Sequence, residues 1–336
     1  MIQVDKNVFR DASPWSIDLS ECNMLEPLVV NRSANGNPFQ YVSDKTIVYL
    51  PGDMGHAAAE GEPNVVIGMD CEQLNLTDGY DFVPPYEFTA TKANYDRKLY
   101  TTKNADGTWS SRAYTICLPY DLNLTEAHYS DRIRVCKLWF IKENREFVFS
   151  NTDPNLKAGQ AYLIVVNEGE LSLEASEASI VTEAGEGEEV YMWETDNQSM
   201  GSWRGSFKKI GNADASAMYA YSLQDSGDFR LISAEAPQAS WEAFRATYCA
   251  NAFTGNNSYK SVFKQYVQGE EEDPFINFPA DVFVGDSNIP AGSVGIMHVI
   301  NDDGSHIYFD LQGRQFPGKP YKKGVYINNG KVVINR

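Results

Sequence analysis

Residues 161–166 read Ala161-Tyr162-Leu163-Ile164-Val165-Val166, a run that is almost wholly apolar and rich in β-branched side chains. A short apolar run of this kind fits a strand that is buried on both faces of a sheet. Three stretches upstream have the same character: Ala113–Leu118, Val135–Ile141 and Glu146–Phe149. The 19 Tyr, 17 Phe and 6 Trp point the same way, since aromatic side chains suit half-buried pleated surfaces. The sequence therefore predicts a fold that is mainly β.

Turn signals divide the remaining apolar runs. Asp106-Gly107 lies between Tyr95–Thr101 and Trp109, and Asn328-Asn329-Gly330-Lys331 joins two apolar runs near the C-terminus. Asp-Gly and Asn-Gly favour the tight turns of β-hairpins, so we expect a hairpin at each place. Residues 250–290 are polar and irregular, which is typical of loops or tethers.

Two small and polar segments, Gly55–Pro63 and Glu183–Glu189, are typical of connectors and suggest domain boundaries. We expect a terminal leucine-rich-repeat-like cap over residues 1–62, because Ile17, Leu19, Cys22 and Leu25 follow the spacing of such a repeat. Two antiparallel β-sandwich-like domains are expected over residues 63–183 and 184–290, and a small β-hairpin module over residues 291–336.

The net charge of −18 argues against nucleic acid as a partner, because a phosphate backbone is bound by clustered Lys and Arg. No stretch approaches the roughly 20 apolar residues of a membrane span, so membrane insertion is not expected. The N-terminus lacks the plan of a signal peptide, and we expect natural sequence upstream of it.

The five cysteines lie far apart and include no CxxC pair. Several lie in apolar runs, which favours unpaired thiols that pack as small hydrophobic groups. They are Cys22, Cys71, Cys117, Cys136 and Cys249. Their spacing does not suggest a metal site.

We find no pattern that assembles catalytic chemistry. His56, His128, His298 and His306 are scattered, and the sequence contains no HExxH, GxSxG or P-loop motif. The acidic runs, such as Glu270–Asp273, lack the alternating ligands of a calcium loop. We therefore expect no catalytic residue, no metal, no cofactor and no enzymatic activity.

Several of these segments together resemble the BspA-like leucine-rich-repeat surface proteins of Bacteroidetes. The resemblance is carried by Ile17–Cys22, Thr46–Pro51, Tyr114–Tyr120 and Lys157–Leu163, and at the C-terminus by Tyr308–Arg314 with Lys323–Lys331. It implies the C-terminal portion of such a protein: a last repeat, β-domains and a C-terminal module. It also implies a cell-surface or secreted location and a role in adhesion or recognition.

The function expected from the sequence is non-enzymatic recognition of host, bacterial or glycan partners at the cell surface. Exposed aromatic rings are common contacts in protein and glycan sites. The candidate ligand-binding residues are Trp109, Trp193, Trp203 and Trp241, although such residues also fill cores. Two alternatives stay open: a glycan-processing enzyme or accessory with an acidic cleft, and a structural spacer near the surface anchor. Paired carboxylates with raised pKa values in a deep pocket would favour the enzyme, and a shallow wet surface would favour binding.

Overall fold

The architecture is taken from a computed structural model, in which 48% of the residues lie in strands and 3% in helices. The mainly β fold class predicted from the sequence is therefore confirmed. The structure describes residues 3–5, 9, 14–103, 109–124, 133–141, 146–152, 154–166, 170–192, 199–224, 228–234, 239–253, 258–266, 275–277, 282–284, 308–310, 315–316, 324–328 and 331–335, some of them through the backbone alone.

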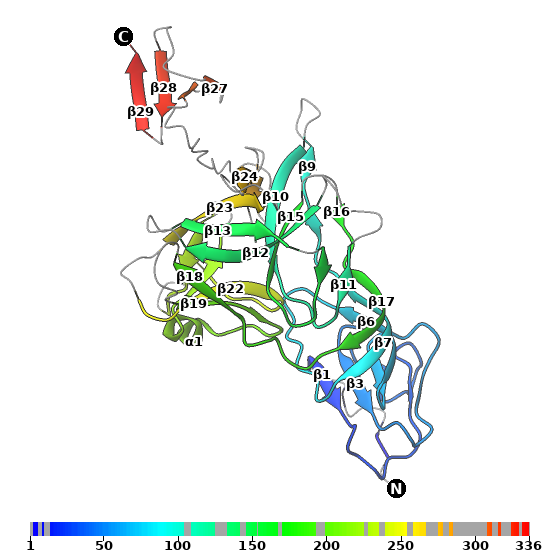
Figure 1. Ribbon diagram of the computed structural model, residues 1–336. Coiled ribbons are helices and arrows are strands. Elements are labelled where there is room, and N and C mark those ends of the chain that lie inside the picture. Colours follow the sequence, from blue (N-terminus) through cyan, green and yellow to red (C-terminus); the bar gives the residue numbers. More distant parts are fainter. Residues whose placement is uncertain are drawn as a thin grey trace.

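A six-stranded sheet forms the part of the molecule nearest the N-terminus (Figure 1). In spatial order its strands are β1 (Ser16–Asp18), β3 (Ile47–Leu50), β5 (Val65–Ile67), β6 (Asp70–Leu76), β7 (Phe88–Tyr95) and β17 (Glu174–Ile180). The first three pair in parallel, with Ile17 opposite Val48 and Val48 opposite Val65. A second parallel ladder joins β2 (Val29–Val30) to β4 (Ala57–Ala58). Buried side chains that include Leu25, Val30 and Phe39 form a core of their own here.

The larger sheet closes on itself. Eight strands pair one after another until the last returns to the first: β12 (Ile133–Ile141), β13 (Glu146–Asn151), β23 (Ser258–Tyr266), β21 (Phe229–Leu231), β20 (Ala220–Leu223), β22 (Arg245–Ala250), β19 (Ser199–Ser206) and β18 (Glu188–Met192). We call this arrangement the closed ring. Aromatic side chains pack together inside it, and the ring centroids of Phe147 and Tyr248 lie 4.8 Å apart.

Three strands extend from β12: β15 (Tyr162–Val166), β10 (Trp109–Ile116) and β25 (Val282–Val284). The four apolar runs singled out in the sequence thus form β10, β12, β13 and β15, as predicted. β9 (Thr102–Lys103) pairs antiparallel with β10 and places Lys103 opposite Trp109, as the expected hairpin requires, while Asp106-Gly107 itself lies outside the described residues. Short pairs of strands complete this region: β11 (Leu122–Asn123) with β14 (Asn155–Leu156), β8 (Leu99–Tyr100) with β16 (Glu170–Leu171), and β24 (Phe275–Asn277) with β23.

The sheets do not follow the expected domain boundaries. The six-stranded sheet takes strands from both sides of residue 62, and the closed ring takes β12 and β13 from before residue 183 and its other strands from after it. One continuous cluster of buried side chains includes Tyr49, Tyr162 and Phe244. Local turn signals mark where a strand ends but carry no information on its distant partner, and for this reason they misplace the divisions between sheets.

A buried arginine joins the closed ring to the six-stranded sheet. Arg245, on β22, donates hydrogen bonds from Nη2 to both carboxylate oxygens of Asp78, at 2.8 and 3.1 Å. Its Nη1 donates to the hydroxyl of Tyr95 on β7 at 2.6 Å, and that hydroxyl donates to Asp78 at 2.5 Å. Each buried polar group in this set has a partner, as a charge in a protein interior requires.

The C-terminal segment forms a four-stranded sheet of β26 (Tyr308–Asp310), β27 (Gln315–Phe316), β28 (Gly324–Asn328) and β29 (Lys331–Asn335). Antiparallel pairing of β28 with β29 places Asn328 opposite Lys331, which confirms the second predicted hairpin. The segment 250–290, expected to be irregular, contains the nine-residue strand β23. The helix α1 (Asn212–Ala217) has six residues, and across the described ranges no helix has the length and apolar character needed to cross a membrane.

Candidate functional site

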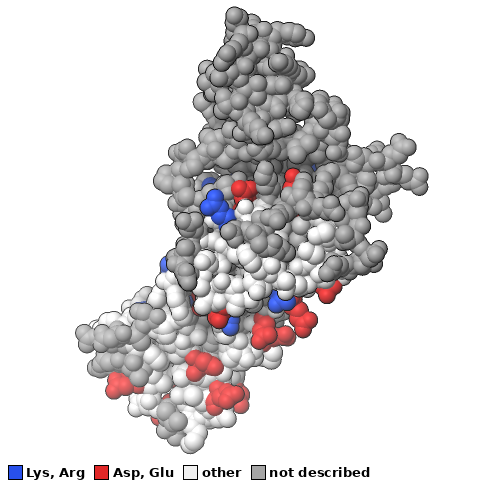
Figure 2. All heavy atoms as spheres, turned by 90° about the vertical axis from the view of Figure 1, so that its left-hand side faces the viewer, with Lys and Arg blue, Asp and Glu red and all other residues white. Residues whose placement is uncertain are grey.

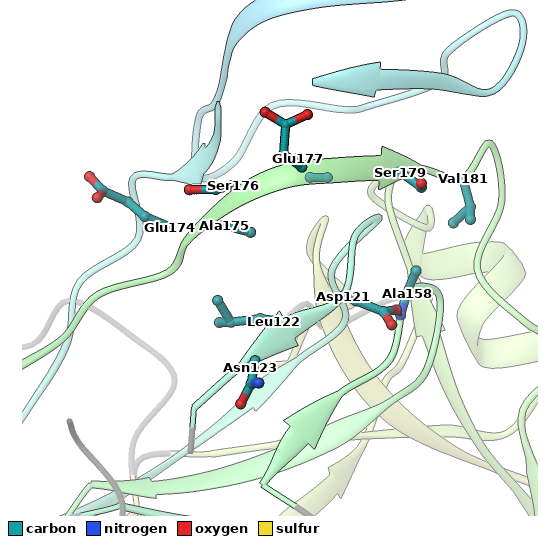
Figure 3. A pocket seen from close by; sticks show the side chains of 11 residues that line it. Asp121, Leu122, Asn123, Ala158, Glu174, Ala175, Ser176, Glu177, Ser179 and Val181 are labelled. Carbon is teal, nitrogen blue, oxygen red and sulfur yellow. The ribbon is translucent and has the colours of Figure 1, made fainter. Parts of the chain in front are cut away.

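A groove runs between the outer edge of β17 and the segment that contains β11 (Figure 3). Its volume is about 560 Å³. One wall is formed by Asp121, Leu122, Asn123 and Ala158, and the other by Glu174, Ala175, Ser176, Glu177, Ala178, Ser179 and Val181. The hollow is within the size range of small-ligand sites.

The β17 wall is made of consecutive residues, and this identifies which part of the strand lines the groove. Side chains of a strand alternate between the two faces of its sheet, so a hollow over one face would be lined by every second residue. Residues 174–179 line the groove without a gap. The groove therefore runs along the backbone edge of β17.

On one wall, the negative charge of Asp121 is neutralised by a neighbouring lysine. Lys157 Nζ donates to Asp121 Oδ2 at 2.7 Å, and the backbone N–H of Ala158 donates to Asp121 Oδ1 at 2.8 Å. Burial alone would raise the pKa of Asp121, but these hydrogen bonds and the positive charge of Lys157 outweigh it and lower the pKa. A carboxyl held in its ionised form suits ligand binding better than the donation of a proton.

The opposite wall is built from small and acidic side chains. Ser176, Glu177 and Ser179 are exposed, while Ala178 is buried against the core beneath. In Figure 3, Glu177 points away from the wall that holds Asp121 and Leu122. Its φ of 50° is rare for a residue other than glycine, and it interrupts the regular edge of the strand.

The predicted tryptophan sites do not converge on this groove. Trp203 is 0% exposed inside the closed ring, and Trp241 is 3% exposed in a small core beside α1. Neither indole offers contact surface, so the expectation of a binding role fails for these two residues. Nearby Gly and Ser residues suggested exposure, but they reflect tight packing between strands. Trp109 begins β10 with its side chain outside the described part, and Trp193 lies outside the described residues.

Other tryptophans reach the surface instead. Trp15 is 48% exposed and meets Tyr80 edge to face, with ring centroids 4.2 Å apart. Trp139 on β12 is 39% exposed. The sequence held a signal for Trp139, because it shares the solvent side of the strand with Lys137, two residues away.

The thiols lie in cores, as predicted. None of the five cysteines forms a disulfide; four of them are buried, and Cys22 is half-buried. Burial raises the pKa of Cys71, Cys136 and Cys249 to about 12, and that of Cys117 further still. A thiol with so high a pKa is a poor nucleophile, because the thiolate is the reactive form.

The carboxylates give no sign of an acid–base pair in the described part of the chain. Burial alone would raise the pKa of Asp78, but Arg245 and the Tyr95 hydrogen bond hold it below its ordinary value. Within the residues that the structure describes, no three His, Cys, Asp or Glu side chains gather as a metal site would require. His56 is described and buried, while His128, His298 and His306 lie outside the described residues, as do Glu270–Asp273.

Figure 2 shows carboxylates spread over the lower part of one face, with few basic side chains among them. This agrees with the net charge of −18. Such a surface repels anionic polymers and attracts cationic ones.

Comparison with known proteins adds no relative. No family model, no curated protein and no solved structure matches this chain.

Proposed function

We propose that this protein is a non-enzymatic recognition protein, secreted or displayed at the cell surface, and that the groove between β17 and β11 contacts its partner. The observation that carries the proposal is that the groove is open and that hydrogen-bonding groups lie among its apolar side chains. Its lining combines hydroxyls, a side-chain amide, carboxylates and exposed strand backbone, all of which can hydrogen-bond a ligand.

The chemistry of the described side chains supports binding over catalysis. The two carboxyls with shifted pKa values, Asp78 and Asp121, are shifted downward, and the buried thiols are held in their protonated form. An enzyme with an acidic cleft would need a carboxyl whose pKa is raised toward neutrality.

The proposed surface location rests on the resemblance to BspA-like proteins. Short parallel strands in chain order, β1 with β3 and β3 with β5, support the repeat-like cap that this resemblance implies. Expression of the full natural gene product, followed by cell fractionation, tests the location: recovery from the cell surface or the medium is expected, and recovery in the cytoplasm would contradict it.

The binding role is tested with purified protein on arrays of glycans and extracellular-matrix proteins. We expect capture of at least one class of ligand, and we expect Ser179→Tyr to abolish it because the new ring fills the groove. Ser172→Tyr is the matched control, since Ser172 is an exposed serine outside the groove. If the parent protein binds nothing on any array, the recognition role is rejected and a role as a structural spacer is favoured.

A further inference from the structure

Two aromatic side chains meet at the surface beside β1. Trp15 directly precedes this strand, and Tyr80 lies in the loop between β6 and β7. The indole of Trp15 stays 48% exposed, although Tyr80 packs against it edge to face with 4.2 Å between the ring centroids. Trp and Tyr provide much of the contact area in binding sites, so this exposed pair is a candidate contact surface. We call Trp15, Tyr80 and the adjacent Lys45 the aromatic platform.

The main chain on the Trp15 side of the platform is fixed. The carbonyl of Trp15 accepts a hydrogen bond from the N–H of Ile47, on β3, at 3.2 Å. The carbonyl of Pro14 accepts another from the hydroxyl of Thr46 at 2.7 Å, and Thr46 is buried. The backbone that carries the indole is therefore held against the six-stranded sheet.

The loop that carries Tyr80 is fixed on both sides of this residue. Before it, Arg245 binds both carboxylate oxygens of Asp78, at 2.8 and 3.1 Å. After it, the N–H of Phe82 donates to the carbonyl of Phe207 at 2.9 Å, and the Phe82 side chain is buried. The backbone under both rings is thus ordered before a ligand arrives, which lowers the entropic cost of binding.

A cation completes the platform. Lys45 Nζ lies 5.2 Å from the centroid of the Tyr80 ring, which is a cation–π contact. Lys45 is exposed, and it forms no ion pair within the ranges that the structure describes. An ammonium group has three N–H donors, so Lys45 can donate hydrogen bonds to a ligand on the platform.

The surroundings of the platform limit the size of the apolar contact. Its neighbours in the chain are small or polar and include Ser16, Asp44, Gly79 and Asp81. Stable protein interfaces bury about 800 Å² on each partner, whereas two aromatic side chains bury no more than about 500 Å² together. A pyranose ring matches the platform better. Its C–H groups pack on the negative face of an aromatic ring, and its rim carries hydroxyls that Lys45 can bind.

We propose that the aromatic platform binds a pyranose ring of a glycan, which stacks on the exposed indole of Trp15 while Lys45 donates hydrogen bonds to its hydroxyls. None of the residues that line the groove between β17 and β11 belongs to the platform. The inference therefore goes beyond the proposed function, because it adds a second contact site with a stated class of ligand. It holds or fails independently of the groove.

The probes are soluble oligosaccharides of about five units, built from β-linked glucose, mannose, xylose or N-acetylglucosamine, or from α-linked glucose. Isothermal titration calorimetry measures their binding to the full chain. We expect at least one of them to bind, and we expect Trp15→Ala to weaken that binding about tenfold through loss of the stacking surface. Lys45→Met should weaken it about threefold, as expected for the loss of an exposed hydrogen bond.

A matched control and a conservative variant separate stacking from a structural role. Trp139→Ala removes an indole of similar exposure, 39%, from the closed ring and should leave binding unchanged. Trp15→Phe should restore part of the affinity, because a phenyl ring still offers an aromatic face. Binding should also change the near-ultraviolet absorption of the parent's indoles, and Trp15→Phe should lack this change.

Two results would overturn the inference: none of these oligosaccharides binds, or Trp15→Ala binds as tightly as the parent. Ser179→Tyr, which fills the groove, distinguishes the two sites. If Ser179→Tyr abolishes binding and Trp15→Ala does not weaken it, the platform inference fails and the proposed function of the groove stands. If Trp15→Ala weakens binding and Ser179→Tyr does not, the platform is the glycan site and the groove is not.

Discussion

In the closed ring, Trp203, Phe229 and Tyr248 fill the interior, and the strands that carry them have hydrogen-bonded neighbours on both sides. Along β17 from Glu174 to Ser179 the side chains are small or acidic, and this part of the strand faces a groove. Large aromatic side chains occur on strands that are hydrogen-bonded on both sides, and small or polar side chains occur on the strand that borders the groove. The comparison teaches that the aromatic richness of this sequence stabilises the scaffold, whereas its candidate site uses backbone and short side chains.

The largest expected loss of stability comes from Trp203→Ala. Removing a fully buried indole leaves a cavity in the closed ring and should lower the free energy of unfolding by about 3–5 kcal/mol. Urea denaturation measures the change. Trp139→Ala, at a 39% exposed indole, is the control and should cost less than about 1 kcal/mol. Equal losses in the two variants would contradict the assignment of Trp203 to the core.

A single methyl group should test how tightly β19 packs against Cys117, which belongs to the core outside the closed ring. An added Cβ at Gly205 would lie 2.2 Å from the Sγ of Cys117 and 2.5 Å from its Cβ, which moves only with the backbone, so Gly205→Ala requires the backbone to shift and should cost about 3 kcal/mol. At Gly185 the nearest atom would lie 3.5 Å away, and Gly185→Ala should be close to neutral. Thermal unfolding that ranks the two variants in the opposite order would show that β19 does not pack on Cys117.

The strands themselves could be predicted from the sequence, because apolar runs and turn dipeptides are local signals. Ala161–Val166 and the hairpin at Asn328–Lys331 were found for this reason. The pairing of β17 with β7 was not, since residues 174–180 read as a polar stretch and their partner lies some 85 residues upstream, as the pairing of Ile180 with Phe88 and of Glu174 with Asn94 shows. A free edge is a property of the whole sheet, and no local pattern reports it. The groove was therefore missed.

Removing the charge of Arg245 should weaken the contact between the closed ring and the six-stranded sheet. Arg245→Gln removes the partner of Asp78 and should lower the free energy of unfolding by about 2 kcal/mol, less than for a fully buried pair because a third of the Asp78 side chain is exposed. Lys157→Gln, at the exposed pair with Asp121, is the control and should cost less than about 1 kcal/mol.

The same pair predicts a dependence on pH. The pKa of Asp78 is lowered in the folded protein, so the unfolded chain binds its proton first as the pH falls. The stability that Asp78 contributes is present above about pH 4 and is lost below it. Arg245→Gln should reduce this acid-induced loss; an unchanged pH profile would mean that the ion pair does not set the pKa.

The smallest expected effect comes from His56, next to the core that contains Leu25, Val30 and Phe39. His56 Nδ1 accepts a hydrogen bond from the N–H of Leu28 at 3.0 Å, and burial lowers the pKa of His56, partly offset by Asp53. The unfolded chain therefore takes up this proton first, and stability should decline as the pH falls below the ordinary value of 6.5. His56→Gln should flatten the change in Tm between about pH 7.5 and pH 5.5. A variant with the same slope as the parent would assign that change to other groups.

Amide hydrogen exchange of the unliganded chain tests the free edge of β17 most directly. We expect the amides of Gly201, Ser202 and Trp203 on β19 to be protected, because this part of the strand pairs with β18 on one side and with β22 on the other. Along Glu174–Ile180 the amides should alternate, with those bonded to β7 protected and those facing the groove exchanging fast. Uniform protection along β17 would show that its outer edge is already covered, and would contradict a groove open to a partner.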